Sequence, residues 1–91
     1  MDPLLTMLKA DLGILSSTAY DARLTKYITS ARSLIVREGV LSLNASSPAD
    51  AQLIVMYAAW LWRKRDTMEG MPPALRVALN DRKFREAVSD D

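Results

Sequence analysis

The feature that most limits what this chain can fold into is an uncharged, largely apolar run over residues 51–62, between Asp50 and Arg63. This run is too short to cross a bilayer, since a transmembrane helix needs about 20 residues. On a helical wheel it is apolar on two opposite sides. One side carries Leu53, Met56, Tyr57, Trp60 and Leu61, and the other carries Val55, Ala58, Ala59 and Trp62. The run therefore predicts a buried helix that has to be covered all round.

Capping residues, prolines and glycines predict two helices before this run. An Asp-Pro pair near the N-terminus favours a short helix over residues 3–12, ended by Gly13. A second, amphipathic helix of about twenty residues is expected to begin with a capping box of Thr18 and Asp21 and to end at Gly39. Its apolar face comprises Tyr20, Leu24, Tyr27, Ile28, Ala31, Leu34 and Ile35.

The apolar run belongs to the third predicted helix. Ser47 and Pro48 are typical of a helix start, and we expect this helix to continue to about residue 68. Pro73 starts a short fourth helix that is expected to end near Asn80. The charged remainder of the chain is expected to be an extended arm that its own subunit holds weakly.

These elements predict an all-α fold. We expect a small bundle of two long antiparallel helices, with a short N-terminal helix and a short C-terminal helix that carries an extended arm. Residues 1–71 form the helical core in this division, and residues 72–91 form the short helix and arm of the same domain. A chain of 91 residues has room for one compact unit.

Composition argues against catalysis. The chain contains neither Cys nor His, which removes the thiolate nucleophile, the disulfide and the commonest general base and metal ligand. Most carboxylates fall near predicted helix ends, where capping and the helix dipole account for them. We therefore expect no enzymatic activity, no cofactor and no metal. The net charge of +1 argues against a dedicated nucleic-acid binder, and the lack of a basic N-terminal segment favours a protein that stays inside the cell.

Two places are candidates for binding. Either another helix of the same chain or a neighbouring subunit has to cover Val55, Ala59 and Trp62, and the sequence leaves both possibilities open. The basic run over residues 63–65 either faces a nucleic-acid backbone or stabilises the C-terminal end of its helix. This run consists of Arg63, Lys64 and Arg65.

Four features together form a pattern that is larger than any single motif. They are a short leading helix, a long amphipathic helix after Ser17, an apolar helix with Ala58-Ala59-Trp60 that starts at Ser47-Pro48, and the segment Met71-Pro72-Pro73-Ala74-Leu75. The pattern resembles the small head-to-tail connector proteins of tailed bacteriophages. The resemblance covers residues 4–79, and the basic segment over residues 82–85 departs from it.

The resemblance implies an all-α subunit without catalytic activity that assembles into a ring below the portal, commonly with twelve-fold symmetry. Such a ring extends the DNA channel and joins the DNA-filled head to the tail. Its partners are further copies of itself, the portal protein, a tail or stopper protein, and genomic DNA that passes without sequence specificity. The expected location is the head-tail interface of the virion, after synthesis in the host bacterial cytoplasm and without a membrane.

The resemblance also suggests roles for the candidate residues. Val55, Ala59 and Trp62 would form the subunit interface, and the basic run would face the DNA channel. The arm would stay mobile until it docks on the portal or a neighbouring subunit through Leu75, Val77, Leu79 and Phe84.

A function of another class competes with the connector. A small helical nucleic-acid-binding or regulatory domain would place its cations on phosphates and lose affinity steeply as salt rises. These cations are Arg63, Lys64, Arg65, Arg82, Lys83 and Arg85. A third class, a metal-dependent enzyme built on carboxylates, would require a bound divalent ion.

Overall fold

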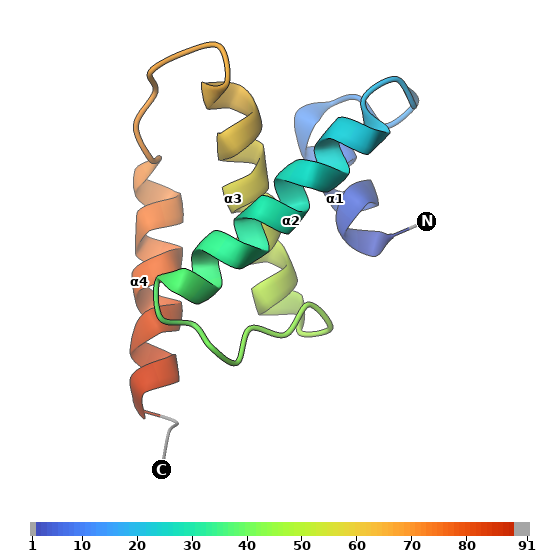
Figure 1. The fold of residues 1–91 in the computed structure, drawn as a ribbon. Helices are drawn as coiled ribbons and strands as arrows, with labels where there is room; N and C mark the ends of the chain where they lie inside the picture. Colours follow the sequence, from blue (N-terminus) through green and yellow to red (C-terminus); the bar gives the residue numbers. More distant parts are fainter. Residues whose placement is uncertain (1, 89–91) are drawn as a thin grey trace.

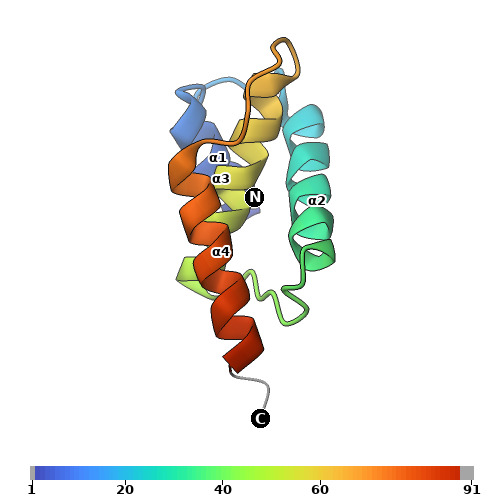
Figure 2. The same ribbon diagram turned by 90° about the vertical axis from the view of Figure 1, so that its left-hand side faces the viewer.

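The computed structural model describes residues 2–88, and within that range the only regular secondary structure is α-helical. Four helices follow one another along the chain, and α3 lies between the other three (Figures 1 and 2). Helices α1 and α2 pack against α3 and against each other, and α4 packs against α3. The all-α prediction is confirmed.

Helix α1, Pro3–Leu12, has the predicted bounds. The carboxylate of Asp2 accepts a hydrogen bond from the backbone N–H of Leu4 at 3.0 Å, which satisfies one of the free donors of the first turn. Gly13 ends the helix in the left-handed conformation, with φ of 75°, and its N–H bonds back to the last turn. Leu4, Leu5 and Leu8 are buried against the rest of the chain.

Helix α2, Asp21–Arg37, begins later than predicted, and the capping box is wrong. Tyr20 is the N-cap residue and makes no side-chain capping bond, while the backbone carbonyl of Thr18 accepts the N–H of Asp21 in a turn. The carboxylate of Asp21 instead lies 2.9 Å from the ammonium of Lys9, a side chain on α1 that is almost fully buried. A buried cation needs a partner, and Asp21 in the first turn of α2 supplies one.

Helix α3, Pro48–Lys64, starts where predicted and ends before residue 68. Ser47 makes no side-chain capping bond. Asp50, three residues after Ser47, accepts the N–H of Asn44 at 2.9 Å and binds an arginine of α4. The first turn of α3 is therefore connected to the preceding loop and to the C-terminal helix.

Helix α4, Pro73–Val88, is the largest departure from the prediction. The helix does not end near Asn80, and its residues as far as Val88 are not an extended arm. Two ion pairs at i,i+4 spacing, Arg82 with Glu86 and Asp81 with Arg85, lie along the segment that was expected to be irregular. Residues 89–91 of the expected arm lie outside the described residues.

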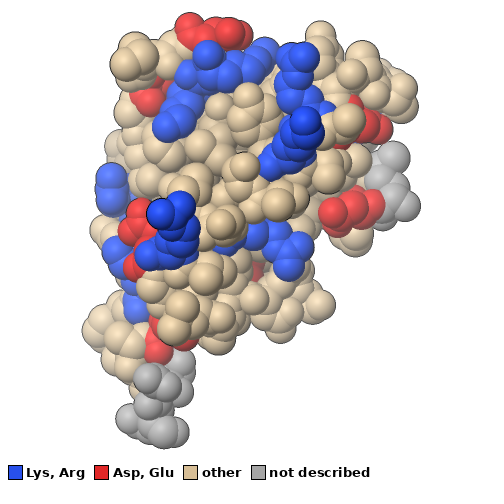
Figure 3. Space-filling view, viewed as in Figure 1, with Lys and Arg blue, Asp and Glu red and all other residues tan. Residues whose placement is uncertain are grey.

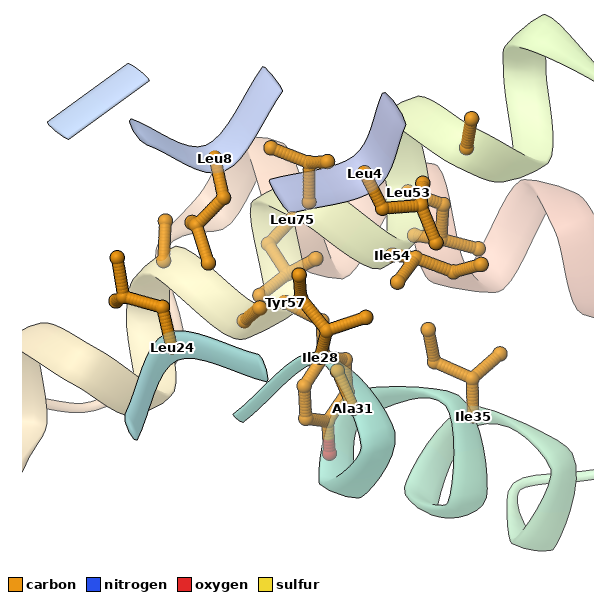
Figure 4. Packing of buried hydrophobic residues seen from close by; sticks show 14 of the residues in the cluster. Leu4, Leu8, Leu24, Ile28, Ala31, Ile35, Leu53, Ile54, Tyr57 and Leu75 are labelled. Atoms are coloured by element: carbon orange, nitrogen blue, oxygen red, sulfur yellow. The ribbon is translucent and has the colours of Figure 1, made fainter. Parts of the chain in front are cut away.

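The buried core is not confined to residues 1–71, because α4, in the part of the same domain that was expected to form a short helix and arm, contributes to it. Leu75 and Leu79 are fully buried. Leu75 belongs to the same buried cluster as Tyr57 and Ile28, and all three are labelled in Figure 4. The buried hydrophobic residues form one cluster, which contains residues from all four helices and Val40 from the loop after α2.

Candidate assembly and binding surfaces

The second apolar side of α3 is already covered by the chain itself. Val55 and Ala59 each expose only 1% of their surface in the single chain. Of the two possible sources of cover, the structure therefore contains the intramolecular one, and these two residues are not available to a neighbouring subunit. Their assignment to a subunit interface is wrong.

Trp62 lies at the end of this side and is half-buried. Its ring meets Tyr20 and Tyr27 edge to face, with ring centroids 5.4 and 5.8 Å away, and the guanidinium of Arg65 lies 3.6 Å from its centroid. Edge-to-face aromatic pairs and a cation over the ring both stabilise such a cluster. The indole therefore joins α3 to the start of α2 within one molecule.

The basic run at the C-terminal end of α3 is exposed, and each of its members has a local partner. Arg63 lies 3.7 Å from the carboxylate of Asp11, and the ammonium of Lys64 lies 4.4 Å from the ring centroid of Trp60. Arg65 binds its own helix, because its guanidinium donates to the carbonyl of Trp62. Cations favour this end of a helix, so local contacts account for all three.

The four residues expected on the docking arm divide into two pairs. Leu75 and Leu79 point into the core and hold α4 on its own subunit. Val77 and Phe84 expose 67% and 65% of their surface, and Val88, which the sequence analysis did not select, exposes 53%. Residues 77, 84 and 88 follow helical spacing, so the three side chains form one exposed apolar stripe along α4. We call these residues the α4 stripe.

A polar cluster on the other side of α4 was not found from the sequence. Arg82 donates to both carboxylate oxygens of Asp50, at 2.8 and 3.3 Å, and to Glu86 at 3.2 Å. The hydroxyl of Ser42 accepts from Arg82 at 3.2 Å and donates to Glu86 at 2.6 Å. With the Asn44 N–H on Asp50, the cluster ties the loop after α2 to α3 and α4. The signal that could have indicated it is the i,i+4 spacing of Arg82 and Glu86.

The charges of this cluster shift the pKa values of its members. Burial alone would raise the pKa of Asp50, but the hydrogen bonds from Arg82 and from the Asn44 backbone, and the positive charge of Arg82, outweigh burial and hold that pKa below its ordinary value. The pKa of Glu86 is lowered mainly by the hydroxyl of Ser42. The pKa of Arg82 is raised, chiefly through its hydrogen bond to Asp50. The cluster is therefore fully ionised at neutral pH.

Open grooves flank the exposed edge of α3, and the charged side chains that line them are ion-paired with one another: Asp11 with Arg63, Asp50 with Arg82, and Asp81 with Arg85. One of about 280 Å³ lies between α3, the end of α1 and the start of α4, and a second of about 250 Å³ lies between α3 and α4. Both include Gln52 and Met56. Residues 2–88 contain no group of three or more His, Cys, Asp or Glu side chains placed to hold a metal ion.

The hydropathy of the helices bears on membranes. Among the helices in the described part of the chain, none combines the length and the apolar character that a bilayer span requires.

Comparisons with protein-family models, with characterised proteins and with solved structures give no match for this chain.

Proposed function

We propose that this chain is a head-to-tail connector subunit of a tailed bacteriophage, a structural protein that forms a ring below the portal, extends the DNA channel and joins the head to the tail. The proposal rests on the resemblance of the helix order and of the Met71-Pro72-Pro73-Ala74-Leu75 segment. In the virion its partners would be further copies of itself, the portal, and a tail or stopper protein.

The α4 stripe is the observation that best supports a docking role. Val77, Phe84 and Val88 are exposed on the side of α4 away from the core, whereas the inner side is held by Leu75 and Leu79. Aligned, exposed apolar side chains on a small protein are typical of an interaction site. Because α4 is already folded, the portal would bind a preformed helix, and docking would need little ordering of the subunit.

Electron microscopy of the purified full chain, alone and mixed with the portal ring of its phage, tests the proposal. The wild-type chain should form rings on the portal. A V77S/F84S variant should keep its helical circular dichroism and its melting temperature, because both side chains are exposed, yet lose this binding.

The matched control is an L15S/L41S variant, which removes two exposed leucines from loops outside α4. It should bind the portal like the wild type. Normal portal binding by V77S/F84S, or equal loss in both double variants, would contradict the docking role of the α4 stripe. If the wild-type chain never associates with itself or with a portal, the connector function itself is wrong.

A further inference from the structure

Among the described residues, the cations that form no ion pair are concentrated on one helix. The sequence contains 12 Lys and Arg residues, and six of them are ion-paired with described carboxylates. Among residues 2–88, the six that are not so paired are Arg23, Lys26, Arg32, Arg37, Lys64 and Arg76. The first four lie on α2, Asp21–Arg37.

The carboxylates nearest to these cations in the sequence are engaged elsewhere. Asp21 is paired with the buried Lys9, and Glu38 lies 3.3 Å from Lys83 of α4. The outer side of α2 therefore keeps its positive charge although the whole chain carries a net charge of only +1. Figure 3 shows the face of the molecule that α2 crosses, where Lys and Arg side chains cover more of the surface than Asp and Glu side chains do.

Three of the four cations share one line along the helix. Arg23, Lys26 and Arg37 are exposed and fall on the side of α2 opposite the buried Leu24 and Ile28. The line spans fourteen residue steps, which is about 21 Å of helix. The exposed positions between these cations on the same line are serines, Ser30 and Ser33. Short side chains there let a broad, negatively charged surface approach the helix closely.

From these observations we propose that the outer face of α2 binds the phosphate backbone of duplex nucleic acid, without reading its sequence. We call Arg23, Lys26 and Arg37 the α2 basic face. A lipid surface fits it less well, because the exposed positions of α2 are small, hydroxyl-bearing or charged and offer no large apolar side chain to insert. The placement of this face in the DNA channel of a ring rests on the proposed function, but the binding itself does not.

The test measures fluorescence anisotropy of a labelled duplex DNA of about 20 base pairs with the full chain, as a function of salt. Binding should be weak, with a Kd in roughly the 10⁻⁶ to 10⁻⁴ M range typical of non-specific contacts near physiological salt. Each phosphate contact adds about 0.9 to the slope of log affinity against log salt, so an R23Q/K26Q/R37Q variant should lose about 2.7 of that slope. At 50 mM salt its affinity should fall at least tenfold.

A K64Q/R76Q/R85Q variant is the matched control, because it removes the same charge from positions outside α2 and leaves the pair of Lys83 with Glu38 intact. It should keep the wild-type slope and most of the affinity. Equal losses in both triple variants would mean that only net charge matters and would overturn the assignment to α2. Equal affinity of the wild-type chain for poly-glutamate would also overturn it, because the surface would then not select phosphate over carboxylate.

Sedimentation velocity of the same variants, alone and mixed with the portal ring, separates this inference from the connector function. If the chain binds DNA through α2 but forms no ring and ignores the portal, the inference stands and the connector function fails. If rings form on the portal while the α2 variant binds DNA like the wild type, the connector function stands and the inference fails.

Discussion

Helices α3 and α4 are nearly equal in length, at 17 and 16 residues, yet they differ in how much of their circumference is covered. Helix α3 is in contact with the three other helices, so its apolar residues are buried or half-buried on both sides. Helix α4 packs on α3 and leaves Val77, Phe84 and Val88 exposed. The number of apolar residues on a helix therefore does not identify a binding surface. The number of neighbours that the helix has inside its own chain does.

The largest expected effect on the free energy of unfolding comes from substitutions on the buried side of α4, compared with substitutions on its exposed side. Leu79 is fully buried and Val77 is 67% exposed. Leu79→Ala removes core contacts and leaves a cavity, so it should lower the free energy of unfolding by about 3 kcal/mol. Val77→Ala should change it by less than about 0.5 kcal/mol. Urea denaturation monitored by circular dichroism measures both.

Equal effects of the two substitutions would break the comparison, because they would mean that α4 is not packed against the core through Leu79. The same reasoning applies to a chain that ends after Gly70. Without Leu75 and Leu79 the core is incomplete, and such a chain should be largely unfolded rather than a folded subunit without an arm.

The second-largest effect is expected at the polar cluster around Arg82, which ties α4 to α3 and to the loop after α2. Arg82→Met leaves the carboxylate of Asp50, which is 4% exposed, without its main partner. A charged group buried in this way is costly, and we expect a loss of about 2 kcal/mol in the free energy of unfolding. Arg76→Met is the matched control, because Arg76 is an exposed arginine of the same helix. A D50N/R82M variant should recover part of the loss, since it removes the unpaired charge.

The sequence predicts the features that depend on neighbouring residues, and it does not predict those that depend on distant contacts such as the cluster around Arg82. Local signals located α1 to the residue and placed the start of α3, because Asp2, Gly13 and Pro48 act on their immediate neighbours. The continuation of α4 past Asn80 depends on contacts far apart in the sequence, such as Arg82 with Asp50. Hydrophobic periodicity is weak there, and i,i+4 pairs alone add only tenths of a kcal/mol.

The candidate surfaces, too, depend on contacts between residues that are far apart in the sequence. Hydrophobic periodicity indicates the second apolar side of α3, but it does not show whether the residues that cover this side belong to the same chain or to another one. The buried Lys9 was missed because a lysine on a short leucine-rich helix is normally exposed. Its pairing with Asp21 joins α1 to α2, and only the tertiary arrangement shows it.

A smaller effect should appear when the pH is lowered. The folded-state pKa of Asp50 lies below its ordinary value, so the folded chain holds this carboxylate charged more strongly than the unfolded chain does. Its contribution to stability is therefore complete above the unfolded pKa of about 3.9 and is lost as the pH falls through the folded pKa. Glu86 contributes in the same direction.

Urea denaturation at a series of pH values from 7 down to 2 measures this loss. Asp50→Asn is the comparison variant, because it should be less stable at pH 7 and should lose less stability on acidification than the wild type. If both chains show the same dependence on pH, the cluster around Arg82 does not contribute to acid sensitivity, and other carboxylates are responsible for it.

The smallest effect concerns the two i,i+4 ion pairs of α4, which have the same spacing and different surroundings. Arg82 and Glu86 have side chains 12% and 19% exposed, whereas Arg85 and Asp81 are 55% and 66% exposed and lie 3.5 Å apart. Solvent screens the outer pair, so Arg85→Gln should change the free energy of unfolding by no more than about 0.5 kcal/mol, and 0.5 M salt should abolish the difference. The effect of Arg82→Met should persist in the same salt, because its partners are shielded from water. A salt-insensitive loss at Arg85 would show that the outer side of α4 is covered in solution, as it would be if copies of the chain associate through the α4 stripe.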